Sequence, residues 1–216
     1  MTSAEPVLRV RALDAWWGRA QALFGVDLEL ARGELVVLQG LNGAGKSTLL
    51  QCICGLCERQ SGEVSYQKRS ILDWPPHRRA QAGIGFVAED RRLFAGLSVR
   101  DNLRIAARRD VAQQERRVLD LFPALAGMLD RRVTQMSGGE QQMLAVARTL
   151  MTQPTLLLLD EPCEGIAPIL VEAMRDALLA LREQGMTLLV AEHNEVLLAR
   201  ADRRVTLVAG AIQPAR

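Results

Sequence analysis

The chain has 216 residues, with 27 lysines and arginines against 25 aspartates and glutamates, a formal net charge of +2. This length suits one domain with a substantial core. A composition that is 49% hydrophobic and 24% charged excludes a collagen, a coiled-coil rod and a disordered tail. A charge balance so close to neutral gives no reason to expect a nucleic acid partner. Only two lysines, Lys46 and Lys68, and two histidines, His77 and His193, are present, so the position of each is informative.

Short apolar runs alternate with helical patterns along the chain, which predicts an α/β fold. The first two runs, 7–13 and 26–30, alternate apolar and polar residues as half-exposed antiparallel strands do. Later runs within 34–39, 155–160 and 187–191 are apolar on both faces, the pattern of central parallel strands covered by helices on both sides. Three further strands are expected at 63–66, 84–88 and 205–209.

The residue pattern changes between Arg91 and Arg132, where no strand pattern is found. Residues 99–122 have a helical pattern, with a break expected at Pro123. This stretch holds ten arginines and five acidic residues, a net charge of +5. It is either the solvated face of a helical region or a separate helical lobe that docks a partner.

Two later helices have clear start and stop signals. Ser137 followed three residues later by Glu140 has the form of a capping box, so a helix is expected from there to about Met151. Pro168 suits the first turn of another helix, and Gly185 suits the residue just past its end.

A glycine-rich loop, residues 40–48, lies between an apolar strand pattern and a helical one, which is the required context of a P-loop. Glycines let backbone N–H groups turn inward around phosphate oxygens, and the following helix N-terminus adds a positive field. We expect Lys46 to reach the β- and γ-phosphates of ATP and the Ser47 hydroxyl to bind Mg²⁺. The expected nucleotide contacts in the loop are Gly40, Asn42, Gly43, Ala44, Gly45, Lys46, Ser47 and Thr48.

Two acids follow the leucine run at 156–159. We expect Asp160 to hold Mg²⁺ through its water shell, in the position of a Walker-B carboxylate. Glu161 stands one residue further, where a carboxylate acts as the general base on the attacking water. These two acids beside a P-loop favour ATP hydrolysis over simple nucleotide sensing.

The stretch Met136-Ser137-Gly138-Gly139-Glu140-Gln141-Gln142 decides between P-loop families. A serine, two glycines and a helix N-terminus form a second anion-binding end that has no phosphate of its own in this chain. The stretch resembles the signature motif of ATP-binding cassette (ABC) ATPases, although many members have glutamine in place of Glu140. The resemblance implies that Ser137, Gly138, Gly139 and Glu140 contact ATP held by the P-loop of an opposing ATPase subunit, either a second copy or a paralogue. Two ATP molecules would then lie between two such subunits.

The resemblance implies roles for four further positions. Trp17, beside Trp16, stands where the family has the aromatic residue that stacks on adenine; a buried structural tryptophan is the alternative. Glu89 replaces the glutamine that senses Mg²⁺ and the transport partner, so it is a candidate metal ligand. His193 matches the switch histidine that contacts the γ-phosphate, or is a structural histidine. Ala167 replaces the usual aspartate of the D-loop, so cross-subunit communication through that carboxylate is not expected.

The resemblance covers essentially the whole chain and implies a single ABC ATPase domain, 1–216. Its fold class is α/β, a P-loop NTPase of ABC ATPase type. The expected core sheet is mostly parallel, with an N-terminal antiparallel β layer and an inserted α-helical lobe at about 91–136. Stretches at 15–19, 88–94, 137–145 and 161–168 are most similar to the smaller ATPase subunit of branched-chain amino acid importers. Urea and amide importers are the close alternative.

This resemblance implies an ATP-hydrolysing subunit that dimerises around two ATP and drives a separate membrane permease. No segment approaches the ~18 uncharged apolar residues of a spanning helix, so the permease must be another chain. The subunit is expected on the cytoplasmic face of the inner membrane, with an external substrate-binding protein acting indirectly. A non-transport ABC ATPase of DNA repair or translation is an alternative, but such proteins usually have long insertions or tandem cassettes. A small-molecule phosphotransferase leaves the signature motif unexplained.

Overall fold

The computed structural model describes residues 5–107 and 109–214. The expected domain limits at 1 and 216 therefore lie outside the described residues, as does Arg108 in the expected lobe. Among the described residues, no helix combines the length and the apolar character needed to cross a bilayer.

Two sheets form the framework. The first is antiparallel, in the order β2-β1-β4-β5, and comprises β1 (Leu8–Trp17), β2 (Ala20–Leu30), β4 (Arg59–Tyr66) and β5 (Arg69–Ser70). The second has the order β10-β9-β3-β8-β7-β6, and all its neighbouring strands are parallel except the β9–β10 pair. Its strands are β3 (Leu35–Gln39), β6 (Ile84–Val87), β7 (Leu156–Asp160), β8 (Thr187–Ala191), β9 (Arg203–Val208) and β10 (Ala211–Ile212).

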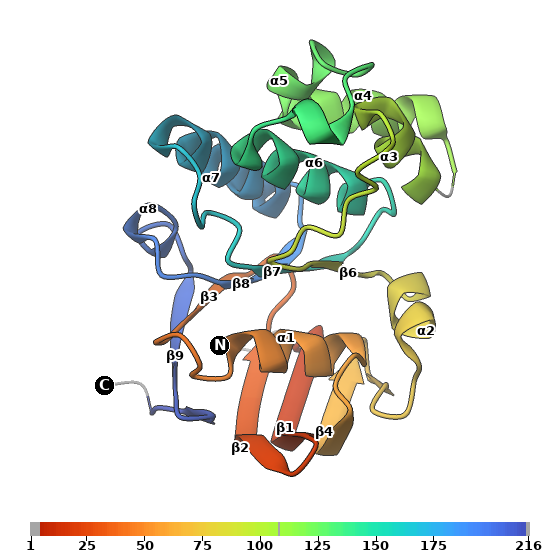
Figure 1. Ribbon diagram of the computed structural model, residues 1–216. Coiled ribbons are helices and arrows are strands. Elements are labelled where there is room, and N and C mark those ends of the chain that lie inside the picture. Colours follow the sequence, from red (N-terminus) through yellow and green to blue (C-terminus); the bar gives the residue numbers. More distant parts are fainter. Residues whose placement is uncertain (1–4, 108, 215–216) are drawn as a thin grey trace.

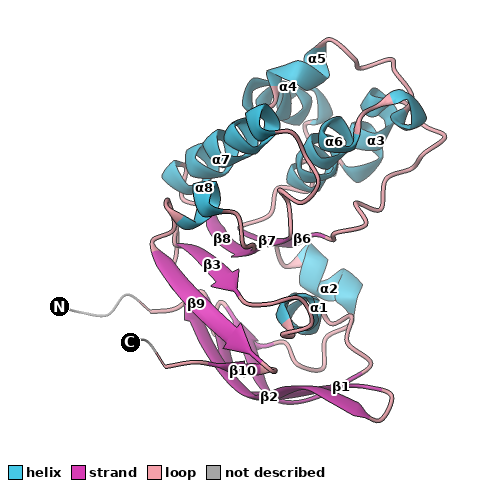
Figure 2. Ribbon diagram, turned by 60° about the vertical axis from the view of Figure 1, so that its left-hand side comes forward, coloured by secondary structure: helices cyan, strands magenta, loops and turns pink. Residues whose placement is uncertain are grey.

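Helices cover both faces of the six-stranded sheet (Figure 1). On one face lie α6 and α7, with α3, α4 and α5 further out; on the other lies α1, with the antiparallel sheet beyond it (Figures 1 and 2). The helices are α1 (Lys46–Cys54), α2 (Pro76–Gln81), α3 (Val99–Ala106), α4 (Val111–Leu121), α5 (Pro123–Ala126), α6 (Gly138–Leu150), α7 (Pro168–Glu183) and α8 (Glu195–Leu198). A 3₁₀ turn, Val133–Gln135, precedes α6.

Alternate residues of the central strands enter two different cores, which explains why these strands are apolar on both faces. On β3, Leu35 and Val37 pack in the core beneath α6 and α7, whereas Val36 and Leu38 pack in the core that contains α1. The strands β7 and β8 divide their side chains in the same way. The prediction of a mostly parallel core sheet with an N-terminal antiparallel layer is confirmed.

The structure corrects three details. The first hairpin is longer than expected, because β1 continues to Trp17, which pairs with Ala20 of β2. The continuous helix expected over 99–122 is wrong: α3 ends at Ala106, the next backbone step is extended, and α4 begins at Val111. Pro123 begins the short helix α5 rather than only ending α4, since proline fits a first helical turn.

Three helices, α3, α4 and α5, lie between β6 and α6 in the sequence and pack on α6. Their apolar side chains, such as Leu103 and Val118, belong to the same core as α6. Part of the positive charge of this region is neutralised within it, because the buried carboxylate of Glu115 lies 3.2 Å from Arg100 and 2.7 Å from Arg104. Because the net charge of +5 already counts Glu115, the region keeps this excess of positive charge.

Candidate nucleotide-binding site

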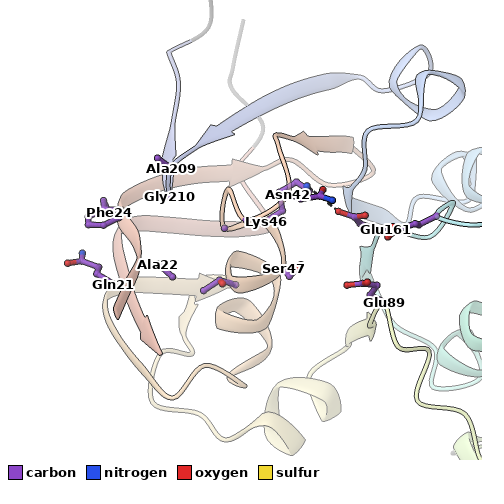
Figure 3. A pocket seen from close by; sticks show the side chains of 14 residues that line it. Gln21, Ala22, Phe24, Asn42, Lys46, Ser47, Glu89, Glu161, Ala209 and Gly210 are labelled. Atoms are coloured by element: carbon purple, nitrogen blue, oxygen red, sulfur yellow. Dashed lines mark ion pairs between the residues drawn. The ribbon is translucent and has the colours of Figure 1, made fainter. Parts of the chain in front are cut away.

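Most of the predicted site residues follow the carboxyl ends of neighbouring parallel strands; Trp17 and the signature residues 137–140 do not. The loop 40–48 follows β3, Glu89 follows β6, Asp160 and Glu161 end and follow β7, and His193 follows β8. Carboxyl ends of parallel strands share one sheet edge, which is where open α/β sheets bind ligands. In Figure 3, Glu161 lies beside the loop, where a dashed line joins it to Lys46, and Glu89 lies on the same side of the pocket as Glu161.

The P-loop needs glycine at two points for different reasons. A Cβ at Gly40 would lie 2.4 Å from the carbonyl oxygen of Leu207, so any side chain would force β3 and β9 apart. Gly45 has φ +105° and caps α1, a conformation that side chains disfavour. The loop thus turns sharply from β3 into the N-terminus of α1, as phosphate binding requires.

Lys46 is buried at the base of the pocket, with 4% of its side chain exposed. Its Nζ donates to the carbonyl oxygen of Gly40 at 2.9 Å and lies 3.1 Å from Glu161 Oε1 (Figure 3). The loop carbonyl fixes the direction of the ammonium, and the catalytic candidate Glu161 is its counter-ion.

The Ser47 hydroxyl donates to Asp160 Oδ1 at 3.0 Å, so the two expected Mg²⁺-binding groups are adjacent. Burial raises the pKa of Asp160 to about 6, although the Ser47 hydrogen bond and the Lys46 charge lower it; the charges of Glu161 and Glu89 raise it further. A hydroxyl and carboxylates are hard oxygen donors, and a cation would relieve this excess of buried negative charge. No group of three or more His, Cys, Asp or Glu side chains converges as a metal cage in the residues described.

Glu161 has the properties of a group that stays ionised. Burial raises its pKa, but hydrogen bonds with Glu164 and Lys46 and the charge of Lys46 outweigh burial, so the pKa lies below its usual value. Its backbone has φ +46° and its N–H donates to the carbonyl oxygen of Ala191 at 2.9 Å. The loop after β7 is thereby attached to the end of β8.

The pocket has a volume of about 540 Å³ and includes residues that the sequence analysis missed. They come from β2, the D-loop and the turn between β9 and β10: Gln21, Ala22, Phe24, Glu164, Ala209 and Gly210. Two backbone hydrogen bonds of 2.9 Å bring these segments together, from Phe24 N–H to the Gly210 carbonyl and from Gly210 N–H to the Ala44 carbonyl. No local sequence motif indicates such long-range contacts. They follow from where the β1–β2 hairpin lies in the fold.

Of the two adjacent tryptophans, Trp17 is the one whose side chain is exposed. The guanidinium of Arg59 lies 4.2 Å above the ring of Trp16, whereas Trp17 is 40% exposed. The Trp17 indole donates to Thr48 Oγ1 at 3.3 Å, which holds it beside the P-loop helix, although Trp17 does not line the pocket itself. The alternative of a fully buried tryptophan is wrong, and stacking on adenine remains a prediction.

Glu89 and His193 differ in their relation to the pocket. Glu89 is exposed and lines it. The His193 side chain is 60% exposed and outside the lining, with its Nδ1 3.8 Å from Glu192. The two residues that the motifs leave over, Lys68 and His77, lie on the surface, where Lys68 pairs with Glu5.

The signature residues lie at the N-terminus of α6. The predicted capping box is confirmed: Ser137 Oγ accepts from the Glu140 N–H at 3.3 Å, and Glu140 Oε2 accepts from the Ser137 N–H at 2.7 Å. A Cβ at Gly139 would lie 2.3 Å from Leu170 Cδ1, so this glycine allows α7 to pack closely. None of Ser137, Gly138, Gly139 and Glu140 lines the nucleotide pocket of the chain.

Comparison with known proteins gives consistent matches. The family model described as ABC transporter matches residues 23–164. The high-affinity branched-chain amino acid transport ATP-binding protein BraG of Pseudomonas aeruginosa is 40% identical over 93% of this chain and 88% of its own length. The probable branched-chain amino acid transport ATP-binding protein LivF of Archaeoglobus fulgidus is 36% identical over 95% and 90%.

Solved structures of ABC transporter cassettes have a similar fold. The ATP binding subunit of an ABC transporter has a TM-score of 0.85 at 29% identity, covering 96% of this chain and 88% of that one. A nucleotide-free cassette of an ABC transporter has a TM-score of 0.87 at 24% identity, covering 97% and 90%, which supports the fold. On these matches, the chain belongs to the ABC transporter family and is an ABC-type ATPase.

Proposed function

We propose that this protein is the ATPase subunit of an ABC importer, which closes with a second ATPase subunit on two ATP molecules and drives a separate membrane permease. The observation that carries the proposal is the division of phosphate-binding parts. The P-loop, Asp160 and Glu161 line or border one pocket, whereas the signature end of α6 lies outside it. An anion-binding helix end with no phosphate in its own chain suits the ATP of an opposing subunit.

The residues predicted from the motifs divide the work of hydrolysis among them. Lys46 and the loop amides bind the phosphates, and Ser47 and Asp160 would hold Mg²⁺, which would neutralise negative charge on the phosphates. The γ-phosphate competes with Glu161 for the Lys46 ammonium, which frees the Glu161 carboxylate to accept a proton from water. Trp17 would stack on the base, Glu89 would be a further ligand for the metal, and His193 would contact the γ-phosphate from the loop after β8.

The second subunit is either another copy or a paralogue. In the closed pair, Ser137, Gly138, Gly139 and Glu140 of each subunit contact the ATP of the other. Because the Glu140 carboxylate accepts from the Ser137 N–H, Glu140 takes part in this contact by fixing the helix end.

We also propose that residues 91–136 form the lobe that receives the permease, within one domain spanning 1–216. A groove of about 290 Å³ supports this, since it lies where this region meets the nucleotide-binding core. Its lining includes Leu56 and Phe86 of the core, Ala106 of α3 and Arg148 of α6. Phe86 is on β6, three residues before Glu89, so a permease segment in the groove would be linked to the nucleotide pocket by one short stretch of chain.

Branched-chain amino acids are the proposed cargo, since this is the cargo in the names of the two relatives above. The protein would act as a peripheral subunit on the cytoplasmic face of the inner membrane, and an external substrate-binding protein would deliver the cargo to the permease. Co-purification with permease subunits, followed by uptake of leucine and of urea in proteoliposomes, tests this. ATP-dependent leucine uptake supports the proposal. Urea uptake would instead assign the protein to a urea or amide importer. Failure to co-purify any permease subunit would contradict a role in transport.

A further inference from the structure

Glu192 is a buried carboxylate that no motif accounts for. It directly follows β8, and only 1% of its side chain is exposed. Within the described ranges, no lysine or arginine forms an ion pair with it; the nearest cationic candidate is the exposed ring of His193, at 3.8 Å. A buried carboxylate without a strong counter-ion is costly unless backbone donors satisfy it.

Three backbone N–H groups satisfy the Glu192 carboxylate. Its Oε2 accepts from the N–H of Cys163 at 3.1 Å, and its Oε1 accepts from the N–H groups of His193 and Asn194, each at 3.1 Å. Bonds from a neutral donor to a charged acceptor are among the stronger hydrogen bonds in proteins. One side chain therefore ties together two loops that are separated by almost thirty residues of sequence.

These two loops carry the groups proposed to act on the γ-phosphate. Cys163 is the second residue after Glu161, and His193 is itself one of the donors. The backbone of Glu161 has φ +46°, a conformation that persists only where the surroundings enforce it. The single backbone bond from Glu161 to Ala191 holds one end of this turn, and Glu192 holds the other.

We propose that Glu192 is a positioning residue that fixes the Glu161 loop and the His193 loop relative to each other for ATP hydrolysis. The proposal rests on the roles proposed above for Glu161 and His193. Glu192 does not touch the nucleotide pocket, so it acts through these two residues and not on ATP. A displacement of either loop by about 1 Å is enough to slow the chemical step strongly.

The chemistry of the anchor requires a carboxylate. In Glu192→Gln, the amide oxygen can accept from one loop, but the amide NH₂ then faces an N–H of the other loop, and two donors oppose each other. Glu192→Asp keeps the charge and loses one methylene, so it cannot reach both loops at once. Both variants loosen the connection between the loops without changing a group that contacts ATP.

The test compares steady-state ATPase kinetics of the full chain with and without these substitutions. Glu192→Gln is expected to lower kcat by about tenfold to a hundredfold, with KM for ATP within about twofold of the parent value. The matched control is Thr187→Val at the opposite end of β8. Thr187 is equally buried and its Oγ1 accepts from the Gly33 N–H at 3.0 Å, so this variant loses a hydrogen bond of a buried side chain away from the site. It is expected to keep the parent kcat.

Coupling distinguishes positioning from general destabilisation. Because Glu192 acts partly through His193, the kcat losses of Glu192→Gln and His193→Ala are expected to be less than additive in the double variant. Unchanged kcat in Glu192→Gln, an equal loss in Thr187→Val, or full additivity would overturn the proposal. If Glu192→Gln does not fold, as judged by circular dichroism, Glu192→Asp decides by the same criteria. Lys46→Ala, assayed alongside, distinguishes failure of the Glu192 proposal from failure of the proposed function. If Lys46→Ala still hydrolyses ATP, the proposed function itself is refuted.

Discussion

In the nucleotide-free protein, the ionised Asp160 carboxylate should lower the free energy of unfolding, and Asp160→Asn should raise it. Its pKa is raised from 3.8 to about 6, chiefly by burial. The folded state therefore binds the proton more tightly than the unfolded state, so the ionised carboxylate destabilises the fold above about pH 6 and ceases to do so as pH falls toward 4. At about 1.4 kcal/mol for each unit, the shift corresponds to at most ~3 kcal/mol. Allowing for residual solvation, we expect ~1–2 kcal/mol at pH 7.5.

Asparagine keeps the oxygen that accepts from Ser47, so the comparison isolates the charge. Urea unfolding of the parent and Asp160→Asn at pH 7.5 and pH 4.5 measures the effect. The variant should be more stable at pH 7.5, and the difference should shrink at pH 4.5. Asp27→Asn is the control, since Asp27 also accepts one hydrogen bond, from the Ala12 N–H, but is exposed. With saturating Mg²⁺ and ADP the order should reverse, because only the parent holds the metal. Equal stability at pH 7.5, or a difference that widens in acid, would refute the reasoning.

Two further substitutions test individual side chains. Lys46→Ala removes the buried ammonium and should abolish turnover and weaken ATP binding, measured by isothermal titration; undiminished hydrolysis would contradict the assigned P-loop role. Trp17→Ala should raise KM for ATP by about threefold to tenfold, as loss of one stacking contact of ~1 kcal/mol predicts, while Trp17→Phe should change it little. The same loss in Trp16→Ala, whose ring Arg59 already covers, would argue against Trp17 as the base-stacking residue.

Local sequence was sufficient for the parts of the site that short-range chemistry dictates. The P-loop glycines, Lys46 and Ser47 are adjacent in sequence and fold as one strand–loop–helix unit, so their pattern alone predicts their arrangement. The rule that parallel strands share a carboxyl edge then brings Glu161 and Glu89 to the same pocket, with Asp160 beside Ser47 at its border. The doubly apolar runs of β3, β7 and β8 were enough to predict a covered parallel sheet.

Long-range packing determined what the sequence did not reveal. Phe24 and Gly210 reach the pocket only because the hairpin β1–β2 and the turn after β9 meet there. The counter-ion relation of Lys46 and Glu161 depends on the distance between two loops, which no spacing encodes. In the sequence, Glu192 is only a single acid between an apolar strand and His193. Its role as an anchor of two loops follows from the three backbone N–H groups that donate to it.

The central claim, that two ATPase subunits close on ATP through the P-loop of one and the signature of the other, is tested most directly with Glu161→Gln. This variant removes the general base and leaves Lys46, Ser47 and Asp160 to bind Mg²⁺-ATP, so the closed pair cannot hydrolyse its nucleotide and reopen. Light scattering coupled to size exclusion should give a dimer with ATP and a monomer with ADP, and Ser137→Arg added to the same chain should abolish the dimer. A monomer with ATP, or a dimer indifferent to Ser137→Arg, would contradict the account.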